Sequence, residues 1–178
     1  MGRNRARSPR WPMLVTLVAI VFAAMSGLTG AQPPTPSTPA LARLASCISG
    51  RQSVAIVLLM DESGSLKETD PDNSRVSAAI AALNGLQGLV ERSNSKVRVD
   101  LQVAGFGPDF EASAPWVQLD SSSAPQIRSR IEGFASRNKA IDTDYANALQ
   151  GAQASLQARG AAMSGSQDEP PCTAVMWF

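Results

Sequence analysis

The chain has 178 residues, of which 44% are hydrophobic, and a formal net charge of +1. Removing an N-terminal leader that carries four arginines and no acid leaves 12 basic and 15 acidic residues, so no basic patch remains that would favour a nucleic acid as partner. The absence of histidine excludes Ser-His-Asp catalysis and histidine-bearing zinc sites, and two cysteines are too few for a four-cysteine zinc site.

Residues 1–31 are predicted to be a secretory signal peptide. Arginines come first, an apolar run follows from Met13 to Met25, and small residues lead to a cleavage point after Ala31. The alternative is an uncleaved membrane anchor, but a membrane span needs about 18 apolar residues and this run is shorter. Residues 32–46, which begin QPPTPSTP, are predicted to be a proline-rich linker. We therefore expect a protein that is secreted or held at the cell surface, with its folded domain at 47–178.

The two cysteines, Cys47 and Cys172, are expected to form a disulfide, because a pair in an oxidising compartment is usually bridged. Cys47 lies shortly before the first predicted strand, and Cys172 lies directly before the last apolar run. Both cysteines would lie at the same edge of the sheet if these two strands are parallel neighbours.

The apolar run Ser53–Met60 predicts a strand buried on both faces of a parallel sheet. Asp61, Ser63 and Ser65 follow it on alternate residues, and the carboxyl end of a central strand is where open α/β sheets bind ligands. One carboxylate with neutral oxygens suits a hard cation, and Mg²⁺ fits best. An ordinary polar turn is the alternative interpretation of this loop.

The middle of the chain alternates predicted helices and strands. An apolar stripe predicts a helix from Ser74 to Val90, and a shorter helix is predicted at Pro125–Phe134. Lys96–Phe106 alternates apolar and polar residues, which predicts a strand with one buried face. Trp116–Leu119 predicts a short edge strand, and Thr173–Phe178 predicts the closing strand.

Thr143 lies just before a further predicted helix that runs through Leu149 and Leu156, with Asp144 near its first turn. A capping role is one interpretation of Asp142, Thr143 and Asp144.

Asp-x-Ser-x-Ser after a buried strand, followed by Thr-Asp-Tyr at the start of a later helix, resembles the von Willebrand factor type A domain of secreted bacterial proteins. The resemblance extends from about Ser53 to Phe178. It implies a Rossmann-like α/β fold, in which a doubly wound, mostly parallel sheet has the strand order 3-2-1-4. It also implies a metal-ion-dependent adhesion site. The positions that match the family's metal ligands are Asp61, Ser63, Ser65 and Thr143.

The same resemblance implies a bound Mg²⁺ or Mn²⁺ and a protein ligand whose acidic side chain completes the coordination. The family's next site residue is an aspartate after the fourth strand, and the sequence ends at Phe178. We therefore expect a fragment, truncated after that strand, whose sheet is incomplete. Membrane attachment would come only from an uncleaved leader or from a missing C-terminal segment.

The expected function is that of a non-enzymatic binding or adhesion module. One alternative is a scaffold that holds no metal. The other is a secreted hydrolase with Ser63 or Ser65 as nucleophile and Lys67 as base. No pattern in the sequence supports this arrangement.

Overall fold

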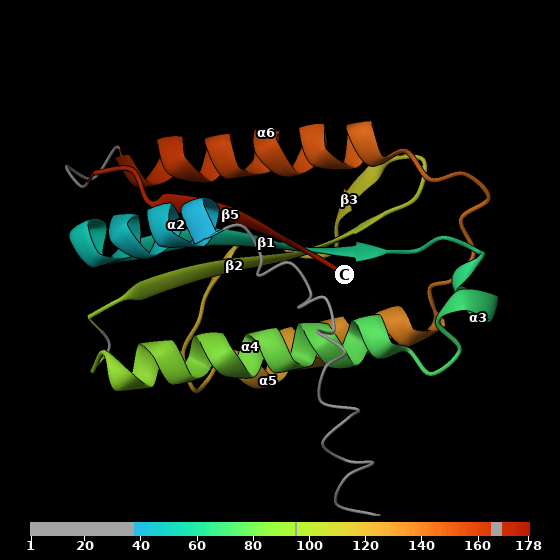
Figure 1. Cartoon of the computed structure of the whole chain (residues 1–178), viewed down its shortest axis with the longest axis horizontal. Coiled ribbons are helices and arrows are strands. Elements are labelled where there is room, and N and C mark those ends of the chain that lie inside the picture. Colours follow the sequence, from blue (N-terminus) through green and yellow to red (C-terminus); the bar gives the residue numbers. More distant parts are fainter. Residues whose placement is uncertain (1–37, 95, 165–168) are drawn as a thin grey trace, which may run out of the picture. The chain divides into compact units, whose positions relative to one another are not determined.

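The computed structural model describes residues 38–94, 96–164 and 169–178, so the predicted signal peptide lies outside the described residues. Residues Pro39–Phe178 form one compact unit. Helices cover both faces of a central sheet in this unit (Figure 1). None of the helices in the described ranges combines the length and hydropathy needed to cross a membrane.

Three parallel strands make the centre of the sheet. β1 (Ser53–Asp61) lies between β2 (Arg98–Phe106) and β5 (Cys172–Trp177). β3 (Phe110–Ala112) and β4 (Val117–Gln118) both pair antiparallel with β2. The order β3-β2-β1-β5 confirms the predicted doubly wound α/β fold, with β1 in the centre.

The helices are arranged in two layers around this sheet. α6 (Tyr145–Ser164) covers one face, and α4 (Ser74–Arg92) and α5 (Ala124–Glu132) cover the other (Figure 1). Four residues of 3₁₀-helix, η1 (Gly133–Ser136), extend α5, and α3 (Leu66–Thr69) is a single turn after β1. α2 (Thr38–Arg51) precedes β1 and packs on the core on the side of α4.

The core lies on both faces of β1, because its side chains alternate between the two helical layers. One set packs with α4 and α5, and the other packs with α6. The first set is Val54, Ile56, Leu58 and Met60, and the second is Ala55, Val57 and Leu59. The prediction that this strand is buried on both faces is confirmed.

The structure differs from the sequence-based expectations at two elements. The range 32–46, predicted as linker, is helical from Thr38 on, because the stretch after the prolines carries Leu44 and Ile48 one turn apart, and both pack against the core. β3 was not predicted, since three residues after a Gly-Pro turn are too short to show a strand pattern.

β2 is buried on both faces, so the prediction of one buried face is wrong. Asp100 is fully buried, and its carboxylate accepts hydrogen bonds from Arg98 at 2.8 Å and from Arg159 of α6 at 2.6 Å. Gln102 is also buried, and its Oε1 accepts a hydrogen bond from Ser155 at 2.5 Å. The alternating polar residues therefore face α6, which satisfies their hydrogen bonds inside the protein.

The disulfide predicted between Cys47 and Cys172 is confirmed. The two Cα atoms lie 6.0 Å apart and the S–S distance is 2.03 Å. Cys172 pairs with Val54 at the start of β1, so the bridge ties α2 to the edge of the sheet opposite the carboxyl ends of the strands.

Candidate metal site

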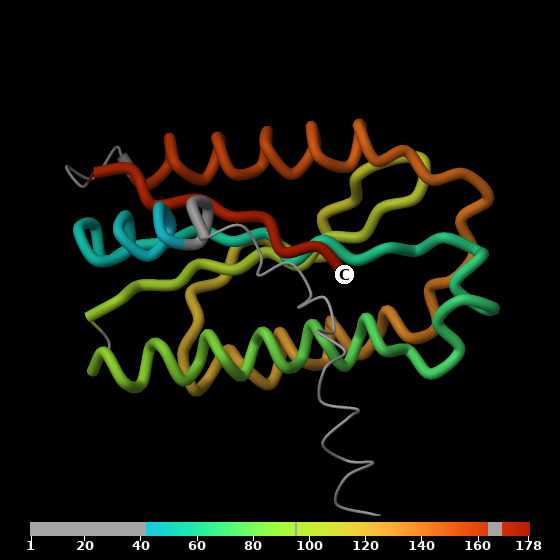
Figure 2. The backbone as a smooth tube through the Cα atoms, in the orientation of Figure 1, coloured from blue at the N-terminus to red at the C-terminus, as the bar shows by residue number. Residues whose placement is uncertain are grey.

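Two segments far apart in the sequence meet at the carboxyl end of β1, where the loop after β1 lies against the segment before α6 (Figure 2). Ser63 and Ala140 form a parallel bridge, and the Gly64 N–H donates to the Ala140 carbonyl at 2.8 Å. The N–H groups of Lys139 and Ala140 donate to the Glu62 carbonyl at 3.1 and 3.0 Å. Backbone hydrogen bonds in both directions therefore hold the two segments together.

This docking brings three of the four predicted ligands into contact. The Ser63 N–H donates to Oδ1 of Asp61 at 2.7 Å, and the Ser63 hydroxyl donates to the same oxygen. The oxygen atoms of the Ser63 and Thr143 hydroxyls lie 2.6 Å apart. Ser63 is 6% exposed, whereas Asp61 and Thr143 are half-buried. The carboxylate and the two hydroxyls form one polar cluster at the edge of the sheet.

Ser65 does not take part in the hydrogen bonds of this cluster. Its side chain is exposed, and its hydroxyl makes no hydrogen bond within the described ranges. Its carbonyl accepts hydrogen bonds from the N–H groups of Glu68 and Thr69 in α3, both at 3.0 Å. The Ser65 hydroxyl therefore remains free of the contacts that fix Ser63.

Thr143 and Asp144, which both precede α6, make different contacts. The Asn147 N–H donates to the Asp144 carboxylate at 2.9 Å, and the Ala148 N–H donates to the Asp144 carbonyl at 3.0 Å. Asp144 thus caps the helix. The Thr143 hydroxyl contacts Ser63 instead.

Two residues beside the cluster were missed in the sequence. Burial raises the pKa of Glu62, although the Arg137 guanidinium at 2.9 Å works in the opposite direction. Arg75, in the first turn of α4, donates from Nε to the Asp61 carbonyl at 3.1 Å. Neither residue gave a signal, because acids and arginines near predicted loops are usually solvated.

The oxygen atoms of the cluster suit a hard divalent cation. Asp61 offers one carboxylate, Ser63 and Thr143 offer two hydroxyls, and Ser65 can add a fourth oxygen from the exposed side. Mg²⁺ and Mn²⁺ prefer such ligands, whereas zinc prefers nitrogen and sulfur. No group of three or more His, Cys, Asp or Glu suited to a metal occurs in the part of the chain that the structure describes, so a site here depends on hydroxyl oxygens.

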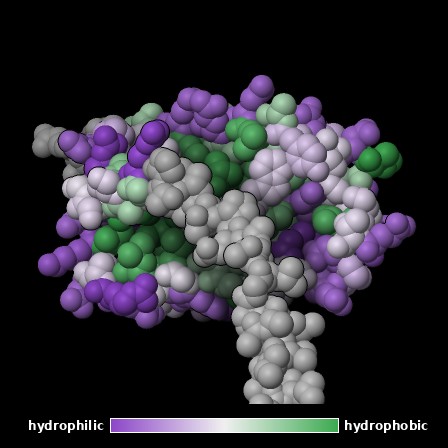
Figure 3. Space-filling model, in the orientation of Figure 1, coloured by the Kyte–Doolittle hydropathy of each residue, from purple (hydrophilic) through white to green (hydrophobic). Residues whose placement is uncertain are grey.

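Large hydrophobic side chains are exposed on the segment that carries Thr143. Ile141 is 98% exposed and Tyr145 is 54% exposed, one on each side of Thr143. The Tyr145 ring lies 5.2 Å from that of Trp177 and 5.9 Å from that of Phe106, measured between centroids. Apolar and polar surface alternate on the face of the domain seen in Figure 3. The polar cluster therefore has hydrophobic residues directly beside it in the sequence.

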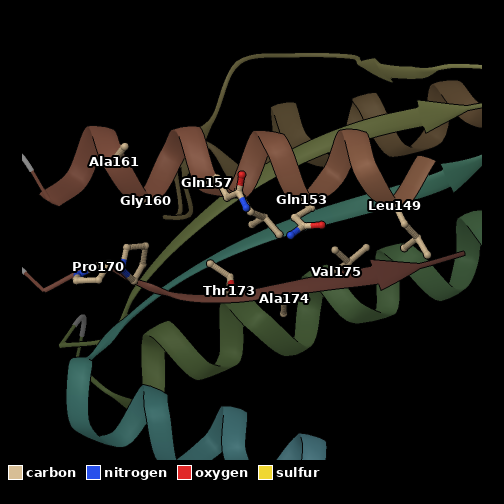
Figure 4. A pocket seen from close by; sticks show the side chains of 11 residues that line it. Leu149, Gln153, Gln157, Gly160, Ala161, Pro170, Thr173, Ala174 and Val175 are labelled. Atoms are coloured by element: carbon tan, nitrogen blue, oxygen red, sulfur yellow. The ribbon is translucent and has the colours of Figure 1, made fainter. Parts of the chain in front are cut away.

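A groove of about 680 Å³ lies elsewhere, between α6 and β5 (Figure 4). Its described lining is apolar except for Gln153, Gln157 and Thr173, so it offers no acid or base. The cluster around Asp61, with its carboxylate, is the better candidate for a functional site.

Comparison with known proteins agrees with the fold. A family model described as von Willebrand factor type A domain matches residues 56–173. No curated protein and no solved structure matches the chain.

Proposed function

Because the chain belongs to the von Willebrand factor type A family, we propose that it is an exported binding module that holds Mg²⁺ or Mn²⁺ and binds a protein ligand through that cation. The observation that carries the proposal is the contact of Ser63 with both Asp61 and Thr143. Thr143 lies 80 residues after Ser63 in the sequence. A polar turn with only a local role would need no partner from a distant segment.

The cation would be held by Asp61, Ser63, Ser65 and Thr143. The bound cation would act as a Lewis acid that attracts an anionic ligand. Three of these four residues contribute neutral hydroxyls, so one carboxylate leaves the cation with a net positive charge. An acidic side chain from the partner is the group that such a site favours.

A protein is the ligand class that the surroundings favour. Ile141 and Tyr145 expose apolar surface on both sides of Thr143, which a folded partner would cover. A carboxylate from a small, fully polar molecule would leave this surface in water. The proposed contact therefore combines a central cation with an apolar border.

Export is supported by the cysteine pair. The bridge between Cys47 and Cys172 closes a long segment, and such bridges persist in oxidising compartments. It agrees with the signal peptide predicted at 1–31, which lies outside the described residues.

Relaxation of water protons tests the open position on the cation. Mn²⁺ added to the full chain is expected to raise the relaxation rate above that of the same Mn²⁺ in buffer, because the bound ion tumbles slowly with the protein and keeps exchangeable water. Acetate is expected to lower this rate by displacing that water, whereas acetamide, of the same size but uncharged, leaves it unchanged. A relaxation rate equal to that of Mn²⁺ in buffer would contradict the cation site, and an enhancement that acetate does not alter would contradict the open position for a carboxylate.

The alternative is a scaffold without metal, which a failure to bind Mn²⁺ would favour. The loop is already fixed by the hydrogen bonds of Gly64, Lys139 and Ala140, so it needs no cation to keep its conformation. A hydrolase has less support, because both sides of the Ser63 hydroxyl are occupied by Asp61 and Thr143.

A further inference from the structure

Arg75 is a buried arginine whose guanidinium group is completely hydrogen bonded. Its side chain is 5% exposed. A guanidinium has five N–H donors, and the structure gives Arg75 five side-chain hydrogen bonds. The acceptors are the carbonyls of Asp61 and Phe134 and the side chains of Asp70, Asn73 and Asn138.

These acceptors belong to three separate segments. Nε donates to the Asp61 carbonyl at 3.1 Å, at the end of β1. Nη1 donates to Asp70 at 2.8 Å, in the turn before α4. Nη2 donates to the Phe134 carbonyl at 2.8 Å and to the Asn138 side chain, where the chain leaves η1. One side chain therefore fastens the end of β1 to the segment that begins at Phe134.

Both halves of the candidate metal site depend on these segments. Asp61 ends β1, and Ser63 follows it in the loop. Asn138 is followed directly by Lys139 and Ala140, whose N–H groups bond to Glu62, and then by Thr143. Arg75 thus connects the two segments from the side of α4, and the backbone bonds between Glu62 and Ala140 connect them next to the site.

We propose that Arg75 is a positioning residue, which fixes the carboxylate half and the threonine half of the site at their working separation before the cation arrives. This inference rests on the proposed function for its effect on cation affinity. Its structural part does not, because the contacts are made by the protein alone. A site held in place in advance binds more tightly, since less ordering accompanies binding.

Lysine cannot replace Arg75 in this role. An ammonium group has three donors on one nitrogen, so at least two of the five acceptors lose their partner. The acceptors are also bound by three different nitrogen atoms of the guanidinium, and an ammonium group has only one nitrogen. Arg75→Lys keeps the charge and much of the buried stem but releases part of the connection between the segments.

Hydrogen exchange of the protein without added cation is the first test. Arg75→Lys is expected to speed exchange of the amides in residues 61–69 and 138–144. Arg159→Lys is the matched control, because Arg159 also pairs with a buried carboxylate, that of Asp100, away from these segments. The control is expected to leave both segments unchanged. Unchanged exchange in Arg75→Lys would overturn the proposal.

Asn138→Ala removes a single contact and guards against a general loss of folding. It is expected to speed exchange in residues 138–144 alone. Exchange that rises across the whole domain in both variants would mean that Arg75 only supports the fold, and it would overturn the positioning role.

A double-mutant cycle on Mn²⁺ affinity is the second test. Arg75→Lys is expected to weaken Mn²⁺ binding by about 10-fold or more, as loss of a residue that orients metal ligands usually does. Thr143→Ala should then add little, because the threonine is already displaced, whereas it should keep its full effect in Arg159→Lys. Fully additive effects of Arg75→Lys and Thr143→Ala would overturn the proposal. A wild-type chain that binds no Mn²⁺ would instead overturn the proposed function, and the exchange test would still decide the role of Arg75.

Discussion

Removing the disulfide gives a prediction whose size follows from the structure. Cys47 and Cys172 are 125 residues apart in the sequence. The chain-entropy relation for a loop of this length gives about 16 cal/mol/K, or about 5 kcal/mol at 25 °C, of stabilisation from restricting the unfolded chain. The variant Cys47→Ala/Cys172→Ala is therefore expected to lose about 3–5 kcal/mol in its free energy of unfolding. Alanine is chosen because Cys172 is 2% exposed, and serine would bury a hydroxyl there.

Unfolding in guanidinium chloride is the assay, followed by far-UV circular dichroism. The denaturant slope of the variant should rise, because its unfolded chain exposes more surface. Each single variant should lose as much as the double variant, since either one breaks the bridge. Reduced wild type should match them. A loss below about 1 kcal/mol with an unchanged slope would refute the reasoning from chain entropy.

Four further substitutions test other parts of the structure. The N–H of Ser74 and the side chain of Arg75 hold the pKa of Asp70 below its usual value, although burial opposes them. Asp70 therefore stabilises the fold above about pH 4, and this contribution disappears as the pH falls through the lowered pKa. The stability difference between wild type and Asp70→Asn, measured in urea from pH 2 to 7, should be full at neutral pH and vanish in acid. Gly107→Ala should destabilise by about 1–3 kcal/mol, because a Cβ there would lie 2.5 Å from the Cβ of Ala140. Gly85→Ala, in open space inside α4, should stabilise by about 0.5–1 kcal/mol, and thermal melts of both glycine variants measure these two changes. Ser65→Ala should leave stability within about 0.5 kcal/mol, because the side chain is exposed, yet weaken Mg²⁺ binding by calorimetry.

The centre of the fold could be predicted because its signals are local. A run of apolar residues that ends in Asp61 marks a strand buried on both faces, and the apolar stripe after Ser74 marks a helix. Cys47 lies shortly before β1 and Cys172 begins β5, and these strands proved to be parallel neighbours, so the disulfide also followed from the order of the elements.

The polar interior could not be predicted, because its partners are distant in the sequence. Asp100 and Gln102 alternate with apolar residues as exposed side chains do, and hydrogen bonds from Arg159 and Ser155 of α6 help to make their burial tolerable. The same holds for Arg75, whose acceptors extend from Asp61 to Asn138.

The candidate site could be predicted in composition but not in arrangement. The sequence pattern named Asp61, Ser63, Ser65 and Thr143 together. It did not indicate that Ser63 would join Asp61 to Thr143 while Ser65 stays exposed. That difference depends on the docking of the segment around Ala140 against the loop after β1. Backbone N–H and carbonyl groups make this contact, so the residue types do not indicate it.

Calorimetric titration with Mg²⁺ and Mn²⁺ decides whether Asp61 and its neighbours bind a divalent cation. The full chain from an oxidising host is compared with Asp61→Ala and with Asp120→Ala. Asp120 is the matched control, because it accepts from the N–H and the hydroxyl of Ser122 at 2.8 and 2.7 Å, as Asp61 does from Ser63, but on an exposed turn. We predict saturable binding by wild type and Asp120→Ala and none by Asp61→Ala. Equal binding by all three proteins, or no binding by the folded wild type, would contradict this prediction.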